Sequence, residues 1–172
     1  MTTTPLRFGL KFIIGFAILM GAFEVSRGSA FERFLVVDLI IAPTAALINW
    51  ATPNEHVVLI DRTLMSAGAN LHITRGCEGV EMFILLIAAI LAFPANLGER
   101  AKGLLMGSVL AYALSISRLM ALHYILRYSP NAWEALHGLV LPLAPIIAIS
   151  LYFMWWSGRI AQISEHSLPH AA

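Results

Sequence analysis

The sequence predicts an all-α, polytopic membrane protein with about four transmembrane helices, an interfacial helix and a small extracytoplasmic cap. Of the 172 residues, 59% are hydrophobic and only 12% are charged, whereas soluble proteins average about 25% charged residues. Long apolar runs approach the ~20 residues that a helix needs to cross a bilayer. A chain of this length has room for one domain, so we expect residues 1–172 to form a single integral membrane domain.

Charge and motif content narrow the possible functions. The formal net charge is +1, which provides no basic field for nucleic acid, so we expect no nucleic-acid partner. The sequence has no His-Glu-x-x-His zinc helix, no Gly-x-Ser-x-Gly elbow and no glycine-rich phosphate loop. We therefore expect neither a metal nor a cofactor. A single cysteine cannot form an internal disulfide, so cysteine usage does not fix the redox compartment.

The first predicted span covers 8–24. Arg7 and Lys11 come before the apolar run from Phe12 to Phe23, which predicts a helix with its N-terminus on the cytoplasmic side. A cleaved signal peptide is the alternative, since Gly28-Ser29-Ala30 resembles a small-residue cleavage site. The charged residues just before that site disfavour cleavage, so we prefer the span.

The apolar segment 34–48 is predicted to lie along the outer membrane surface. It is shorter than the ~20 residues that a span needs, and it is interrupted by Asp38, Pro43, Thr44 and, at its end, Asn49. Charge distribution supports this interpretation. If the segment does not cross, the positive-inside rule is satisfied by the basic residues at the ends of the other spans: Arg7, Lys11, Arg100, Lys102 and Arg159.

An external loop is predicted at 52–76. Two short apolar runs, Val57 to Ile60 and Leu71 to Ile73, lie among turn-forming residues. Runs of this length separated by glycine, proline and asparagine are typical of short strands. We expect them to form a hairpin that caps the helices.

The other spans are predicted at 79–95, 103–126 and 136–156. Arg118 falls about 6 Å below the outer boundary of the third span, given a rise of about 1.5 Å per residue. An arginine at that depth is costly unless it is paired or faces a wet cavity, so it marks a candidate functional site. The alternative is an arginine that only anchors the helix by extending toward the interface.

Cys77 is the only cysteine, and it lies in a polar, glycine-rich segment just before the second span. A thiol at the start of a helix is close to unpaired backbone N–H groups, which favour the thiolate. The alternative is a cysteine that packs as a small hydrophobe. Glu78 and Glu81 oppose ionisation of the thiol, and we expect them to meet Arg118, Arg75 or basic groups of a substrate.

Cys77, Arg118 and His137 are predicted to reach the same outer layer from three segments. These groups suffice for acyl transfer. The imidazole takes the thiol proton and later protonates the leaving amine, and the guanidinium stabilises an oxyanion or orients the substrate carbonyl. His123 is the alternative base, but it lies five residues after Arg118 and projects about 140° around the helix from it.

The order of these residues and their local motifs resemble the exosortases and archaeosortases, and the short chain resembles an H-type-like bacterial subtype. The resemblance covers about 68–156. It rests on four motifs: Arg75-Gly76-Cys77-Glu78-Gly79-Val80-Glu81, Ala92-Phe93-Pro94-Ala95, Ser115-Ile116-Ser117-Arg118-Leu119, and Tyr128-Ser129-Pro130-Asn131-Ala132-Trp133-Glu134-Ala135-Leu136-His137.

The resemblance implies a cysteine protease or transpeptidase embedded in the bacterial cytoplasmic (inner) membrane. Such an enzyme cleaves C-terminal, PEP-CTERM-like sorting signals of exported proteins at the outer membrane face, through a thioester on Cys77, with Arg118 and His137 completing the site. The implied partners are the transmembrane sorting signal and membrane lipids. One position departs from the family pattern, because Ser115 stands where an asparagine is usual, and a hydroxyl offers fewer hydrogen bonds than an amide.

A function from another class competes with this one. The chain would then be a noncatalytic membrane scaffold or a small transporter, in which Arg118 binds an anionic headgroup or solute. Substitution of Cys77 separates the two hypotheses, because an enzyme of this type loses all activity with serine at this position while a scaffold tolerates it.

Overall fold

The computed structural model describes residues 5–166, with side chains up to residue 162. The described chain is mostly helical, and four of its helices are long and apolar enough to cross a membrane. They are Pro5–Val25, Ala30–Ala51, Leu97–Tyr128 and Pro130–Gln162. By length and composition, these helices agree with the predicted polytopic helical class. Their bounds differ from the expected spans, because Ala30–Ala51 meets the length criterion and the helix after Cys77 is shorter than expected.

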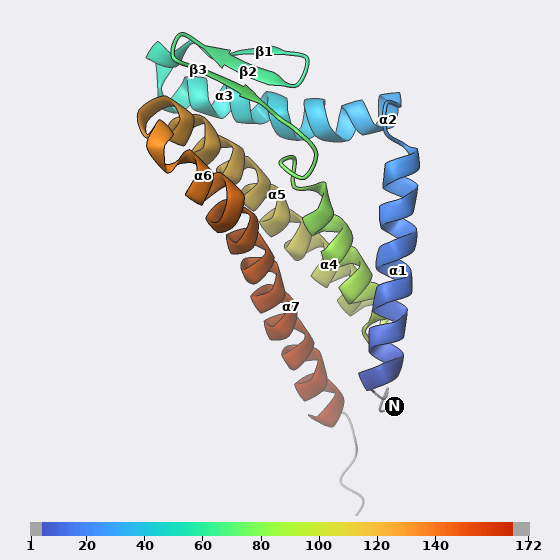
Figure 1. The fold of residues 1–172 in the computed structure, drawn as a ribbon. Helices are drawn as coiled ribbons and strands as arrows, with labels where there is room; N and C mark the ends of the chain where they lie inside the picture. The colour runs from blue at the N-terminus through green and yellow to red at the C-terminus, as the bar shows by residue number, and fades with distance from the viewer. Residues whose placement is uncertain (1–4, 167–172) are drawn as a thin grey trace, which may run out of the picture.

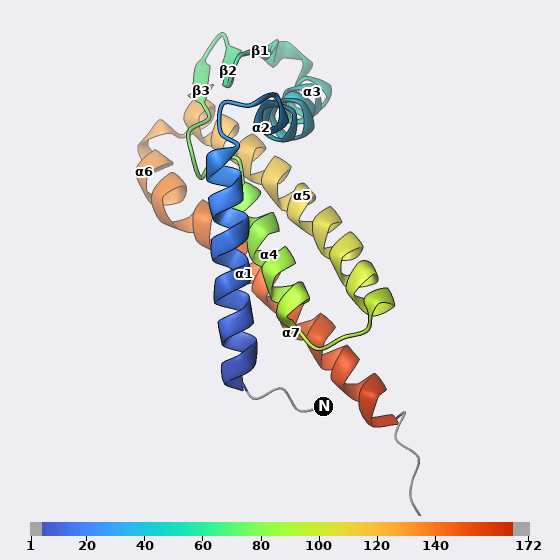
Figure 2. The same cartoon turned by 90° about the vertical axis from the view of Figure 1, so that its right-hand side faces the viewer.

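Four helices run side by side away from the cap (Figures 1 and 2). They are α1 (Pro5–Val25), α4 (Val80–Ala92), α5 (Leu97–Tyr128) and α7 (Leu141–His166). The short helix α4 lies between the other three and contacts each of them, so most of its side chains are buried. The start of α1, the start of α5 and the end of α7 all lie at the end opposite the cap, which we call the far end.

The segment expected at 34–48 belongs to a longer continuous helix, Ala30–Ala51. It consists of α2 (Ala30–Arg33), π-helical turns (Phe34–Ile41) and α3 (Ala42–Ala51). In Figure 1 it lies across the ends of α1 and α5 instead of running beside them, and we call it the transverse helix. Its orientation fits a surface segment, although its length alone would allow a span.

Pro43 does not end the transverse helix, because the π-helical turns before it change the hydrogen-bond register. The Ala42 N–H donates to the Val37 carbonyl, five residues earlier, and Pro43 then occupies the first turn of α3, where its missing N–H is least costly. The buried Thr44 hydroxyl donates to the Ile40 carbonyl at 2.7 Å. Residues that read as interruptions in the sequence therefore fit within one helix.

The cap is a three-stranded antiparallel sheet that lies above the transverse helix (Figure 1). Its strands are β1 (Val58–Ile60), β2 (Thr63–Ser66) and β3 (Ala69–His72). The two predicted strands are present as β1 and β3, but the hairpin expected between them was wrong, because β2 lies between them and pairs with both. The prediction missed β2, in which only Leu64 is fully buried. A two-residue turn joins β1 to β2, and Asp61 adopts a positive φ of 54° there, a conformation that aspartate tolerates better than most residues.

Two groups of buried side chains form the core. The group at the cap end joins the transverse helix, the sheet and the upper part of α5, and Cys77 belongs to it. The second group lies nearer the far end, between α4, α5 and α7. There Gly103 allows the Trp156 ring to approach α5 so closely that a Cβ would lie 2.5 Å from the indole nitrogen. Small residues at such contacts let helices pack tightly.

Candidate active site

Cys77 and His137 contact each other at the cap end. The Cys77 Sγ lies 3.4 Å from the His137 Nε2, although 60 residues separate them in the chain. The cysteine comes from the loop between β3 and α4, and the histidine comes from the π-helical turns Leu136–Val140 that precede α7. A thiol and an imidazole at this distance share a hydrogen bond, through which a proton can pass from sulfur to nitrogen.

A tight turn holds Cys77 in place. Its backbone N–H donates to the Thr74 carbonyl at 3.1 Å, and the Thr74 hydroxyl lies 3.6 Å from the Sγ. Gly76 and Gly79 flank the cysteine with φ values of +79° and +80°, which only glycine adopts readily. The side chain is 8% exposed.

Contrary to the prediction from the sequence, Cys77 does not lie at the start of a helix. Helix α4 begins at Val80, three residues after Cys77, so the thiol lies outside its first turn. The recorded partners of the sulfur are the His137 ring and the Thr74 hydroxyl. These two groups, and not helix N–H groups, therefore determine its immediate surroundings.

His137 is positioned by the ring of Trp133. The two rings are nearly parallel, with an interplanar angle of 7° and centroids 4.7 Å apart. Trp133 belongs to the same motif as the histidine, but the contact between the two rings was not predicted. The spacing of four residues on a helical segment was the available signal, because residues four apart share a helix face.

Arg118 is buried against the loop that carries Cys77. Its Nη1 donates to the Gly76 carbonyl at 2.9 Å, and only 8% of the residue is exposed. Its Nε has no hydrogen-bond partner among the described residues. Arg118 also lines a cavity of about 280 Å³, together with Phe16, Gly76, Gly79, Glu81 and Pro142. The guanidinium therefore fixes the residue before the cysteine, while its buried Nε remains without a partner among the described residues.

Ser115 does not reach the cysteine. The serine is fully buried, and its hydroxyl donates to the Ala111 carbonyl at 2.9 Å. It lies so close to Gly79 that a Cβ there would be 2.6 Å from the hydroxyl oxygen. Ser115 therefore forms a contact between α5 and the loop that carries Cys77.

Glu78 pairs with a residue that sequence reasoning did not single out. Its carboxylate is fully buried, and it accepts a hydrogen bond from Arg27 at 3.4 Å. The expectation that Glu78 meets Arg75 or Arg118 was wrong, because the segment after α1 folds back over the loop. Burial raises the pKa of the Glu78 carboxyl above its usual value. Glu81 and Arg75 form no ion pair with the described side chains.

The alternative base, His123, belongs to a separate cluster under the cap. It is fully buried, and its Nε2 lies 3.7 Å from the Glu55 carboxylate, too far for a hydrogen bond. Glu55 instead accepts a hydrogen bond from the Tyr128 hydroxyl at 2.6 Å, which lowers the pKa of the Glu55 carboxyl. His123 thus faces an acidic group. As its position on the helix predicted, it does not share a face of α5 with Arg118.

No metal centre forms among the described residues, since no three histidine, cysteine, aspartate or glutamate side chains converge there. Comparison of the chain with protein families, with curated proteins and with solved structures found no match. The case for a function therefore rests on the geometry of this site and on the motifs of the sequence.

Proposed function

We propose that the chain is an exosortase-like cysteine protease or transpeptidase that cleaves C-terminal sorting signals of exported proteins at the outer face of a bacterial cytoplasmic membrane. The 3.4 Å contact between the Cys77 Sγ and the His137 Nε2 carries this proposal. The motifs that resemble the exosortases supply both residues. They also supply Arg118, whose guanidinium holds the neighbouring Gly76 carbonyl.

The proposed reaction begins with transfer of the Cys77 proton to the His137 Nε2. The thiolate attacks the scissile carbonyl carbon, and the carbonyl electron pair moves to oxygen to give a tetrahedral oxyanion. When the carbon–nitrogen bond breaks, the imidazolium gives its proton to the leaving amine, and a thioester remains on Cys77. Water or an acceptor amine then attacks the thioester carbonyl, with His137 as the base. The carbon–sulfur bond breaks, and the Cys77 thiolate takes the proton back from His137.

Arg118 has two proposed roles. Its bond to the Gly76 carbonyl fixes the cysteine loop, and its buried Nε has no hydrogen-bond partner among the described residues, which is costly for a donor. Arg118 also lines the adjoining cavity, where a substrate carbonyl oxygen would accept from a guanidinium N–H group. Hydrogen bonds that strengthen as the oxygen gains charge lower the barrier more than they stabilise the bound substrate.

We propose that the cap faces the outside of the cell. Basic residues lie near the start of α1, the start of α5 and the end of α7, and these three ends lie together at the far end. The cap end carries five arginines as well, Arg27, Arg33, Arg62, Arg75 and Arg127, so the positive-inside rule does not set the orientation by itself. The proposed orientation rests on the resemblance to the exosortases, which implies a site at the outer membrane face. The cavity beside Arg118 also contacts α1, α4 and α7, so a transmembrane segment of the substrate could approach it laterally from the bilayer.

Co-expression with an exported protein that carries a C-terminal transmembrane helix and a basic tail tests the proposal. The substrate is tagged on both sides of its helix, and release of the tail is followed by immunoblot. We expect release with the wild-type chain and with a His72→Ala control in the cap, and none with Cys77→Ala or Cys77→Ser. A hydroxylamine-sensitive adduct on Cys77 would identify the thioester. Release that continues in Cys77→Ala would show that the proposal is wrong.

A noncatalytic scaffold or small transporter is the second candidate, and the unpartnered Arg118 Nε favours it. In that case Arg118 binds an anionic headgroup or solute in the cavity. The close Cys77–His137 contact then has no role. A chain whose biological activity survives Cys77→Ser but not Arg118→Gln would support this candidate over the enzyme.

A further inference from the structure

A second polar cavity lies at the cap end, and it does not include Arg118, Cys77 or His137. Its volume is about 390 Å³. The charged side chains that line it come from the segment after α1, the start of the transverse helix, the β1–β2 turn and the cysteine loop. They are Arg27, Arg33, Arg62, Arg75, Glu32 and Asp61.

We propose that this cavity binds the phosphate of an anionic phospholipid headgroup. Four guanidinium groups and two carboxylates line the cavity, and two of these guanidinium groups form no ion pair with a described carboxylate. Guanidinium groups bind phosphate oxygens through paired N–H donors and stay charged at every physiological pH. The proposal is independent of the proteolytic function, because it concerns other residues and a ligand that is not cleaved.

Two of the arginines are available for a ligand. Arg62 pairs with the buried carboxylate of Glu32, and Arg27 pairs with Glu24 and Glu78 at 2.7 and 3.4 Å. Arg33 and Arg75 form no ion pair with any described side chain. The paired arginines fix the walls of the cavity, and the unpaired ones provide the donors that a phosphate requires.

Backbone also contributes to the cavity. Gly28, Ser29 and Ala30 line it at the point where the transverse helix begins. The first turn of a helix carries a partial positive charge that favours anions. This contribution adds to the field of the arginines, which remain the main reason for an anion site.

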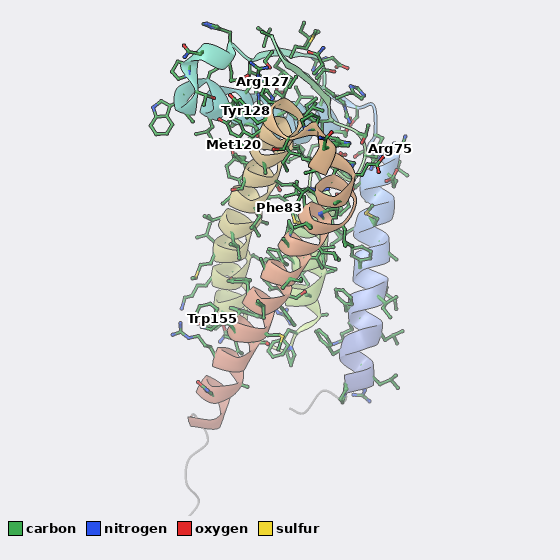
Figure 3. All side chains as sticks on the ribbon, turned by 60° about the vertical axis from the view of Figure 1, so that its left-hand side comes forward. Arg75, Phe83, Met120, Arg127, Tyr128 and Trp155 are labelled. Carbon is green, nitrogen blue, oxygen red and sulfur yellow. The ribbon has the colours of Figure 1, made fainter. Side chains whose placement is uncertain are left out.

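The position of the cavity favours a lipid over a soluble anion. It lies where α1 meets the transverse helix, and the surface of that helix presents large apolar side chains to its surroundings. Phe31 is 59% exposed, Phe34 is 51% exposed and Trp50 is 82% exposed. A helix with such residues is stable at a membrane surface, in the layer that contains the headgroup phosphates. Figure 3 shows Arg75 in the same region, beside the cap end of α1.

An apolar cavity adjoins the polar one and could receive part of an acyl chain. It has a volume of about 390 Å³ and lies between α1, the transverse helix and α4, with Phe23, Phe31 and Phe83 in its wall. Arg27 lines the polar cavity, and its guanidinium carbon lies 5.0 Å from the centre of the Phe23 ring. The contact between Arg27 and Phe23 therefore separates the polar cavity from the apolar one. A polar and an apolar cavity side by side suit an amphipathic ligand.

Lipid titrations of the purified full chain in a neutral detergent test this inference. The probes are phosphatidylglycerol, phosphatidylcholine with the same acyl chains, and inorganic phosphate. Bound lipid is counted by native mass spectrometry, and thermal unfolding reports affinity, because a ligand of the folded state raises the unfolding temperature. The variants are Arg33→Gln with Arg75→Gln, Asp61→Asn, and Arg159→Gln at the far end as the control.

We expect phosphatidylglycerol to bind more tightly than phosphatidylcholine and inorganic phosphate. The double arginine variant should weaken phosphatidylglycerol binding at least about tenfold, since it removes the charge-assisted hydrogen bonds of both unpaired guanidinium groups to the phosphate. Asp61→Asn should tighten binding, because asparagine tolerates the positive φ at this turn while the repulsive charge is lost. A variant that merely unfolds cannot bind better, so this gain is specific to the proposal.

Two results would overturn the inference. Inorganic phosphate that binds as tightly as phosphatidylglycerol would identify a free phosphate site without a lipid. Phosphatidylglycerol binding that is the same in the double variant, in Asp61→Asn and in the Arg159→Gln control would show that the lipid binds elsewhere.

Discussion

The Trp133 and His137 rings stack with an interplanar angle of 7° and a centroid separation of 4.7 Å. This contact limits rotation of the imidazole whose Nε2 lies 3.4 Å from the Cys77 Sγ. In the proposed reaction the base must point at its proton to be effective, so the stacked ring would support that reaction without touching the substrate. Trp133 is in this sense a positioning residue.

Replacement of Trp133 should separate positioning from packing. Trp133→Ala removes the stacked surface, and we expect cleavage of the tagged sorting signal to fall by about tenfold or more, since small misplacements of catalytic groups are costly. Trp133→Phe keeps a flat ring and should restore most of the activity. If alanine and phenylalanine behave alike while both variants accumulate normally, the stack has no role in positioning.

Arg118→Lys tests whether directed hydrogen bonds are needed. Lysine keeps the charge but lacks the planar fork that can hold the Gly76 carbonyl and leave a second donor for the substrate. We expect a loss of about 10²- to 10³-fold in cleavage rate, as for loss of an oxyanion-hole donor. Nearly full activity with lysine would mean that the arginine supplies only a diffuse positive charge.

Replacement of the two histidines His137 and His123 should affect the cleavage rate differently. His137→Ala removes both the base and the acid for the leaving group, so we expect cleavage to fall by about 10²- to 10⁴-fold. His123→Ala should have little effect on cleavage, because His123 lies against Glu55. Both rates are measured after membrane levels are equalised. An inactive His123→Ala variant together with an active His137→Ala variant would show that His123, on α5, is the base.

Glu78 should make the protein less stable as pH rises. Burial raises its pKa in the folded chain above 4.5. Between the pKa of the unfolded chain and that of the folded chain, the folded state therefore binds more protons than the unfolded state. Stability then falls as pH increases through that window. We expect Glu78→Gln to unfold at a higher temperature than the wild type near pH 7, and the difference to shrink below about pH 4. A difference that does not vary with pH would contradict this expectation.

Glu55 should show the opposite dependence on pH. The hydrogen bond from Tyr128 lowers its pKa in the folded chain below 4.5, so its stabilising contribution is present above that value and is lost as pH falls. Tyr128→Phe removes the donor. We expect the variant to lose stability at neutral pH and to lose less of it on acidification than the wild type, as measured by thermal unfolding from pH 7 to pH 3.

Local sequence patterns sufficed for some features of this structure. The long apolar runs indicated the helical class, and the motifs around Cys77 and His137 indicated a pair that the structure places in contact. Such predictions succeed when one local signal, such as apolar length or a motif, reflects the main constraint on the residue.

Other features depended on contacts between distant segments. Arg27 looked like one charge in a polar linker, and only the fold brings it to Glu78, 51 residues away. Pro43 looked like an interruption of the segment 34–48, because its effect depends on the hydrogen-bond register of the preceding turns. Strand β2 has too few apolar residues to be recognised before its neighbours are known.

The approach of Ser115 to Gly79 has a consequence for how the site can vary. The loop is so close to α5 that even one additional carbon on Gly79 would lie 2.6 Å from the serine hydroxyl. A bulkier residue at 115, such as asparagine, would need space that the loop now occupies, and the loop would have to move outward. The volume of one buried side chain thus limits how closely the loop can pack on α5.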